Sequence, residues 1–341
     1  MIFFLLNGNN GSTYILNTKA ITASLNFYQA RTKKQKIQKN FLKIYLKLLA
    51  LFNSHKLKNK KEVNLLLDTL CSQSIDFNVD DNCSILVSPT RDKVIVHHHG
   101  DCFHKFAFGN SYKNVRNEAE IYKLLNKPLQ SFHISKLYDF QDDGTVCSFK
   151  LANQHEKKEE NIDLTSALVD LFNCSRQENV PFVDYLESVK AKLNSSAVAC
   201  KEFAIQMLEK FGEAYKKKQI PLGLTHRDFK HWNINTDAGL LIYDFEEAVT
   251  DGPPLEDLFN YHIDPVVRYL PPSKVSQIIF RAENIQEYKR YLNKLDIDMD
   301  FKPLLYAYLI ERSLFWMERD DEVASEKYCI LLEHIAKMDE K

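Results

Sequence analysis

The feature that most constrains the fold is a change of hydrophobic pattern near residue 153. Between about residues 81 and 153, short runs rich in Val, Ile and Phe alternate with turn residues, which is typical of antiparallel strands. From residue 154 to 341, apolar residues recur every three or four positions over long segments, which is typical of helices. We therefore predict an α+β chain: a small antiparallel β lobe with one helix at about 115–125, then a mainly helical lobe.

Residues 1–80 form an extension before the predicted β lobe. Its opening apolar run is too short for a signal peptide or a membrane span, and it predicts a strand that ends in a Gly/Asn turn. A later stretch predicts a helix with one apolar stripe beside the lysines of residues 36–61. The stripe consists of Phe41, Ile44, Tyr45, Leu48 and Phe52. Two interpretations remain open: the helix packs on the body with a solvated lysine face, or it is a cationic surface helix that contacts anionic lipid or an acidic partner.

Charge and cysteine usage exclude several classes of protein. The formal net charge is -1, so nothing in the overall charge points to nucleic acid. The seven cysteines are scattered and form no CxxC pair, which argues against a disulfide framework and a structural zinc site and favours a reducing compartment. No segment is long and apolar enough to suggest a transmembrane helix. We expect a cytoplasmic protein.

One short β-rich stretch inside the helical part, residues 222–247, is dense in polar residues. Asp228 and Asn233 lie five positions apart on a predicted tight loop, and Asp244 follows an apolar strand at 240–243. Phosphoryl transfer needs metal ions on the phosphates and a carboxylate near the attacking hydroxyl. Magnesium prefers oxygen ligands, so a carboxylate and an amide are adequate.

These residues carry a family resemblance. HxDxxxxN at 226–233, followed by a strand and Asp-Phe-Glu at 244–246, resembles the motif shared by aminoglycoside phosphotransferases, choline kinases and protein kinases. The segment at 252–259, GPPLEDLF, resembles the one that follows in these families. The combination is also similar to phosphotransferase-like proteins of bacterial surface-polysaccharide synthesis, which typically carry Gly at the position of Arg227. The resemblance implies a bilobal, protein kinase-like fold.

The resemblance also implies roles for individual residues in the helical lobe. Asp228 would be the catalytic base, and Asn233 and Asp244 would hold magnesium against the ATP phosphates. Glu246 resembles the second acid of choline kinases and would assist the metal or the substrate. Two residues would be structural supports of the catalytic loop: His226 and Asp257.

In the β lobe, the resemblance implies a strand lysine on the α- and β-phosphates of the nucleotide, held by a helix glutamate. Lys105 fits the first role and Glu118 the second, with Glu120 as a rival. No glycine-rich loop is visible between residues 84 and 96, so the choice between ATP and GTP stays open.

Together these features predict an ATP- and Mg²⁺-dependent phosphotransferase that acts on a hydroxyl of a small or lipid-linked acceptor: a sugar, amino sugar, aminoglycoside or choline-like molecule. Four acids suggest an acidic acceptor region that would suit a cation: Glu246, Glu247, Glu256 and Asp264. A pseudokinase that serves as a binding module is one alternative. A protein kinase is disfavoured, because the short segment between Asp244 and Asp257 has no room for an activation segment.

Overall fold

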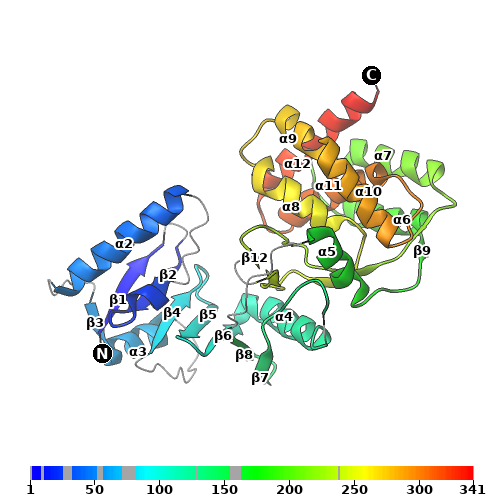
Figure 1. Cartoon of the computed structure of the whole chain (residues 1–341). Coiled ribbons are helices and arrows are strands. Elements are labelled where there is room, and N and C mark those ends of the chain that lie inside the picture. Colours follow the sequence, from blue (N-terminus) through cyan, green and yellow to red (C-terminus); the bar gives the residue numbers. More distant parts are fainter. Residues whose placement is uncertain are drawn as a thin grey trace. The chain divides into compact units, whose positions relative to one another are not determined.

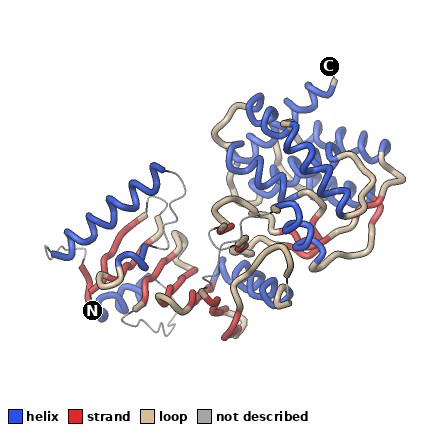
Figure 2. The backbone as a smooth tube through the Cα atoms, viewed as in Figure 1, coloured by secondary structure: helices blue, strands red, loops and turns tan. Residues whose placement is uncertain are grey.

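A computed structural model of the chain describes residues 2–8, 11–25, 33–51, 57–70, 82–127, 129–153, 163–236 and 239–340. The chain divides into two compact units (Figure 1), Met1–Asn126 with Ile134–Glu156 and Lys127–His133 with Lys157–Lys341. The first unit is built on one antiparallel sheet, and the second is mainly helical (Figure 2). The predicted α+β class is confirmed.

The sheet of the first unit has eight strands in the order β3-β1-β2-β4-β5-β6-β8-β7. They are β1 (Ile2–Asn7), β2 (Thr13–Asn17), β3 (Leu57–Asn59), β4 (Cys83–Val87), β5 (Lys93–His98), β6 (Cys102–Phe108), β7 (Leu137–Asp142) and β8 (Val146–Ala152). The opening strand predicted from the apolar run is β1. Because β2 pairs with β4, the strands of the first 80 residues continue the same sheet as the predicted β lobe.

Two helices cover opposite faces of the β1–β2 hairpin. They are α2 (Lys33–Leu51), which is preceded by the single turn α1 (Ile21–Ser24), and α3 (Lys60–Leu70). Successive side chains of a strand point to opposite faces, so Phe3 and Phe4 enter different cores. Phe3 packs with Val63 and Leu67 of α3, and Phe4 packs with Leu46 of α2. The first unit therefore has apolar cores on both faces of its sheet.

The face of α2 that packs on the sheet is not the predicted apolar stripe. Leu46 is buried and Leu42 lies against the same core. The four described residues of the stripe are exposed: Phe41, Ile44, Tyr45 and Leu48. Phe52 lies outside the described residues. The helix does pack on the body, as one interpretation held, but it does so through a second apolar face and not through the predicted stripe.

Helix α4 (Tyr112–Leu124) corresponds to the helix predicted at 115–125. It follows β6 and packs on the part of the sheet formed by β6, β7 and β8. Its buried side includes Val115, Ala119, Ile121 and Tyr122. This packing places one face of α4 over the centre of strand β6.

The second unit consists of helices around a few short strand pairs. The helices are α5 (Leu164–Asn173), α6 (Phe182–Asn194), α7 (Lys201–Ala214), α8 (Glu256–Val267), α9 (Pro272–Ile279), α10 (Ala282–Lys294), α11 (Phe301–Met317) and α12 (Glu322–Asp339). Helix α11 is apolar and buried on nearly all sides, and it contacts α6, α7, α8, α10 and α12. Helices α11 and α12 are separate, because the chain turns through a positive φ at Asp320 and Asp321 caps α12.

The short strands pair two by two. β9 (Val180–Pro181) pairs with β10 (Gln219–Ile220), β11 (Gly223–Thr225) with β14 (Val249–Gly252), and β12 (Ile234–Asn235) with β13 (Leu241–Ile242). The last two pairs flank the polar stretch that the sequence singled out. Among the described residues, no helix is both long and apolar enough to span a membrane.

The cysteines correct the prediction that argued against disulfides in this chain. Cys200, at the start of α7, and Cys329, in α12, form a disulfide across 129 residues of sequence, with their Cα atoms 5.5 Å apart. Sequence spacing could not reveal a pair that only the packing of two helices brings together. The other described cysteines are thiols: Cys83, Cys102, Cys147 and Cys174.

Candidate active site

The β12–β13 hairpin brings Asn233 and Asp244 together. Ile234 lies opposite Ile242 in the register, and the Tyr243 N–H donates to the carbonyl of Asn233 at 3.2 Å. Asn233 and Asp244 therefore leave the same end of the hairpin. Asp244 has a φ of 69°, a left-handed conformation that is rare outside glycine and is often kept at functional sites. The tip of the hairpin at 237–238 lies outside the described residues.

The carboxylate of Asp228 is held at both oxygens. The amide nitrogen of Asn233 donates to Oδ2 at 2.8 Å and to the Asp228 carbonyl at 2.9 Å. Lys230 Nζ forms an ion pair with Oδ1. Each carboxylate oxygen has a second lone pair, so both contacts leave Asp228 able to accept one more proton or hydrogen bond. The carboxylate is thus oriented by its own loop.

His226 is fully buried beside this loop, and both of its ring nitrogens are engaged. Nε2 lies 3.0 Å from the carbonyl of Tyr243, which can only accept, and Nδ1 lies 3.3 Å from the N–H of Asp228, which can only donate. The ring is therefore the tautomer with hydrogen on Nε2. It also packs against Phe229 and Phe245. This geometry favours a supporting role for His226 over that of a base.

Asp257, at the start of α8, holds the loop backbone from the other side. It accepts from the N–H of His226 at 2.8 Å and from the N–H of Arg227 at 2.9 Å. Burial raises the pKa of Asp257 to about 6, although His226 and these donors act in the opposite direction. The contacts are those expected of the structural support predicted at this position.

Arg227 takes a φ of 60°, the left-handed region that favours glycine. The contacts of the Arg227 side chain therefore have to compensate for a strained backbone. Its Nε lies 3.0 Å from Glu256 Oε1, and Glu256 also accepts from the Thr225 hydroxyl at 2.9 Å. Arg227 is thus anchored in the lobe.

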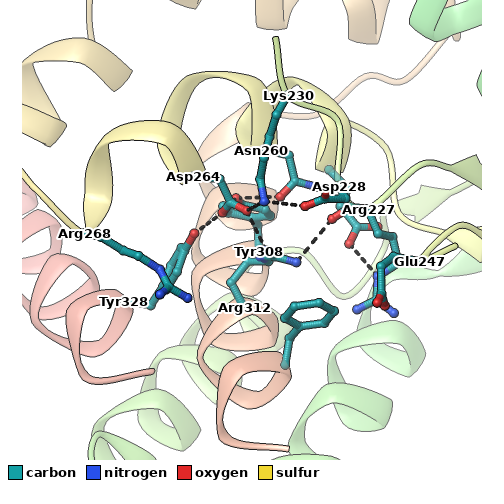
Figure 3. A network of polar contacts seen from close by, with 12 residues as sticks. Arg227, Asp228, Lys230, Glu247, Asn260, Asp264, Arg268, Tyr308, Arg312 and Tyr328 are labelled. Carbon is teal, nitrogen blue, oxygen red and sulfur yellow. Dashed lines mark hydrogen bonds and ion pairs between the residues drawn. The ribbon is translucent and has the colours of Figure 1, made fainter. Parts of the chain in front are cut away.

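Below the loop lies a buried polar network (Figure 3) that the sequence did not predict. Asp264 of α8 binds Lys230 at 3.1 Å and Arg312 of α11 at 2.5 Å, and it accepts from the hydroxyls of Tyr308 and Tyr328. Burial alone would raise the pKa of Asp264, but the two cations outweigh it and hold the pKa below its usual value.

The network connects to the loop at two points. Lys230 bridges Asp264 and Asp228, as Figure 3 shows, and Arg312 donates to the carbonyl of Arg227 at 3.3 Å. A buried charge is stable only when it is paired, so these contacts fix the position of Lys230 and, through it, of Asp228. One signal was present in the sequence: Arg312, next to Glu311, is one of the few charged residues in the middle of a helix that is otherwise mostly apolar.

In the first unit, Lys105 and Glu118 form a buried ion pair. Lys105 lies on β6 between Ile95 of β5 and Phe149 of β8, and its Nζ is 2.5 Å from Glu118 Oε2 on α4. The rival, Glu120, is exposed and pairs with Lys123. Helix periodicity explains the difference, since positions two apart face opposite sides of a helix. Glu118 is therefore the partner of Lys105.

The donor set of the second unit suits magnesium. Asn233 turns its amide nitrogen to Asp228, which leaves its side-chain oxygen as the atom for a metal ion. Asp244 and the partly buried Glu246 add carboxylate oxygens at the end of the hairpin. An all-oxygen set of one amide and one or two carboxylates is what Mg²⁺ takes when phosphates and water complete its shell.

The predicted acidic acceptor region is largely neutralised. Glu256 is paired with Arg227, Asp264 with Arg312 and Lys230, and Glu247 with Arg319 at 2.5 Å. These three acids carry little unbalanced charge, so they do not favour a cationic acceptor over a neutral one.

A sequence model of the phosphotransferase enzyme family matches residues 90–291, more than half of the chain. The chain belongs to the phosphotransferase enzyme family. The match includes every predicted site residue from Lys105 to Asp257, and it leaves out residues 1–89 and 292–341. The sheet with α4, followed by the helices, gives this phosphotransferase the α+β, protein kinase-like fold that the motifs implied. A search among curated protein sequences gives no match.

Several solved structures resemble the phosphotransferase at low identity. The GDP complex of aminoglycoside 2'-phosphotransferase-IIIa is 12% identical, with a TM-score of 0.46 over 81% of this chain and 98% of that one. A putative fructosamine-3-kinase from Haemophilus somnus is 11% identical, with a TM-score of 0.42 over 71% and 86% of the two chains. The family assignment rests on the sequence match, and neither comparison supports the likeness to proteins of polysaccharide synthesis.

Proposed function

We propose that this phosphotransferase uses ATP and Mg²⁺ to phosphorylate a hydroxyl group of a small or lipid-linked acceptor. The observation that carries the proposal is the loop at 226–233, which fixes both oxygens of Asp228 and, through the hairpin, sets Asn233 beside Asp244. This is the set of groups that phosphoryl transfer requires, within a chain of the matching family.

Asp228 is the proposed base. It accepts the proton of the acceptor hydroxyl as the hydroxyl oxygen bonds to the γ-phosphorus, and the bond from that phosphorus to the bridging oxygen of ADP breaks. Lys230 and Asn233 hold the carboxylate so that its orientation is set before the acceptor arrives. His226 and Asp257 keep the loop backbone in place.

The nucleotide side of the reaction uses the remaining residues. Lys105, oriented by Glu118, binds the α- and β-phosphates. Asn233, Asp244 and Glu246 would hold magnesium, which neutralises charge on the phosphates when it is bound. We propose ATP, and not GTP, as the phosphate donor. We also propose a cytoplasmic location, where both ATP and magnesium are supplied.

The structure favours a small acceptor over a protein. Between Asp244 and Asp257 the chain forms strand β14, which pairs with β11, and then enters α8 directly. No long loop fits between these two elements. A protein kinase needs an activation segment there to bind its peptide. Sugars, amino sugars, aminoglycosides and choline-like alcohols remain the candidate acceptors, and the neutralised acids give no preference for the cationic ones.

The test combines binding and turnover. Calorimetric titration with Mg-ATP, followed by ATP turnover with and without pooled sugars, amino alcohols and aminoglycosides, is carried out on the full chain. Asp228→Ala should bind Mg-ATP but lose acceptor-stimulated turnover, whereas Asp251→Ala, an exposed aspartate of β14, should retain both. Failure of the wild-type protein to bind Mg-ATP would leave a pseudokinase scaffold as the better account.

A further inference from the structure

Helix α2 carries an exposed apolar stripe on the side opposite its packing face. Ile37, Phe41, Ile44, Tyr45 and Leu48 are all exposed, and they recur at the three- and four-residue spacing of a single helix face. These are five of the thirteen large exposed apolar residues in the described part of the chain, so the stripe is a concentrated feature. Side chains of this kind are normally covered by something.

The charged residues of α2 itself are all lysines. The sequence of α2 contains six lysines and no acidic residue. Lys43 and Lys47 lie on one side of the helix between the packing face and the stripe, and Lys39, one turn before Lys43, lies nearer the packing face. Burial, together with repulsion from Lys43, lowers the pKa of Lys39, as expected where cations crowd one side of a helix. A neighbour that covers the stripe must therefore tolerate or attract this charge.

The rest of the extension does not share this character. On α3, Lys58 is paired with Glu62 at 3.5 Å, and Leu65 is a single exposed apolar residue. Among the described residues of the extension, α2 is therefore the element that combines an exposed apolar stripe with several lysines. It also lies outside residues 90–291, the part of the chain that matches the phosphotransferase family.

We propose that α2 is a membrane-surface helix that docks this protein on an anionic lipid bilayer. The helix lies in the plane of the interface, with Phe41 and its apolar neighbours in the acyl boundary and the lysines at the lipid phosphates. At about 1.5 Å per residue, its 19 residues reach roughly 28 Å along the surface. Charge complementarity selects anionic over neutral lipid. An acceptor held in a membrane would then be met at the surface where it resides.

The test is vesicle co-sedimentation of the full-length protein. Vesicles of phosphatidylcholine alone are compared with vesicles that contain phosphatidylglycerol, at low and high salt. The wild-type protein should bind the anionic vesicles at least tenfold more tightly, and high salt should weaken that binding, because each lysine contributes roughly fivefold.

Matched variants distinguish vesicle binding through the stripe from non-specific binding through any exposed apolar residue. Phe41→Glu and the pair Lys43→Glu with Lys47→Glu should each reduce binding at least tenfold. Leu65→Glu should not, although Leu65 is 67% exposed, close to the 68% of Phe41. The melting temperature of Phe41→Glu should equal that of the wild-type protein, since the side chain does not pack on the sheet.

Three results would overturn the proposal. The first is no binding, or equal binding to neutral and anionic vesicles. The second is a change from dimer to monomer in Phe41→Glu with vesicle binding unchanged, which would make the stripe a contact between two copies of the chain. The third is a loss of stability in Phe41→Glu as large as in Leu46→Ala, which would mean that the chain itself covers the stripe. None of these bears on ATP turnover, so the proposed function is tested separately.

Discussion

Arg312 is the residue whose removal tests the buried network most sharply. Its side chain is 0% exposed, binds Asp264 at 2.5 Å and packs on the ring of Phe315, 4.1 Å from the ring centroid. Arg312→Met keeps most of the packing volume but removes the cation. Removing one partner of a buried ion pair lowers the free energy of unfolding by about 3–5 kcal/mol. Lys230 remains beside Asp264, so we expect the lower end, a loss of about 3 kcal/mol in the free energy of unfolding.

Both tryptophans of the chain, Trp232 and Trp316, belong to the second unit, so tryptophan fluorescence during urea unfolding reports on that unit. Arg290→Met is the matched control, because Arg290 forms an exposed pair with Asp163 at 3.0 Å. An exposed pair contributes at most about 1 kcal/mol. If Arg312→Met lowered the free energy of unfolding no more than Arg290→Met does, the argument would be refuted.

The same variant has a predictable pH dependence. The pKa of Asp264 is lower in the folded protein than in the unfolded chain, where it is about 4. The stability that Asp264 contributes is therefore present above about pH 4 and is lost as the pH falls through its folded pKa. The difference in unfolding free energy between the wild-type protein and Arg312→Met should shrink below pH 4. A difference that stays constant would contradict the assignment of the ion pair.

Three further predictions concern the loop and the nucleotide. Glu118→Gln should weaken Mg-ATP binding by about tenfold in calorimetry, because Lys105 loses its partner, whereas exposed Glu120→Gln should bind as the wild type does. Gly252→Ala should lower the unfolding free energy by about 1–3 kcal/mol, because an added Cβ would overlap Thr225; an unchanged value would be contrary to this packing. Asp257 has a folded pKa of about 6, so the wild-type protein should gain stability over Asp257→Asn as the pH falls from about 7 to 5. A difference independent of pH would show that Asp257 does not titrate there.

Local patterns predicted the elements of the site well. The β lobe, its helix and the strand before Asp244 followed from short-range patterns, which strands, turns and helix faces obey. The pairing of a strand lysine with a helix glutamate was implied by the family resemblance, and Lys105 and Glu118 do form an ion pair. The choice of Glu118 over Glu120 also lay within reach, because Glu118 shares the buried side of α4. The roles of these residues in catalysis stay predictions.

What sequence patterns could not supply were contacts between distant segments. Lys230 and Arg312 converge on Asp264 only because α8 and α11 pack together. The Cys200–Cys329 disulfide depends in the same way on the packing of α12 near the start of α7. Helix α2 has two apolar faces, and periodicity alone does not say which of them the β1–β2 hairpin will cover.

The central claim is tested most directly by the phosphorylated product. The full chain is incubated with Mg-ATP and the acceptor pool, and ³¹P NMR follows the appearance of a phosphate ester. We predict an ester signal with the wild-type protein that is absent with Asp228→Asn, a variant that keeps the shape of the side chain but cannot accept the proton. An ester formed equally fast by Asp228→Asn would contradict the role of Asp228 and the account of the loop built around it.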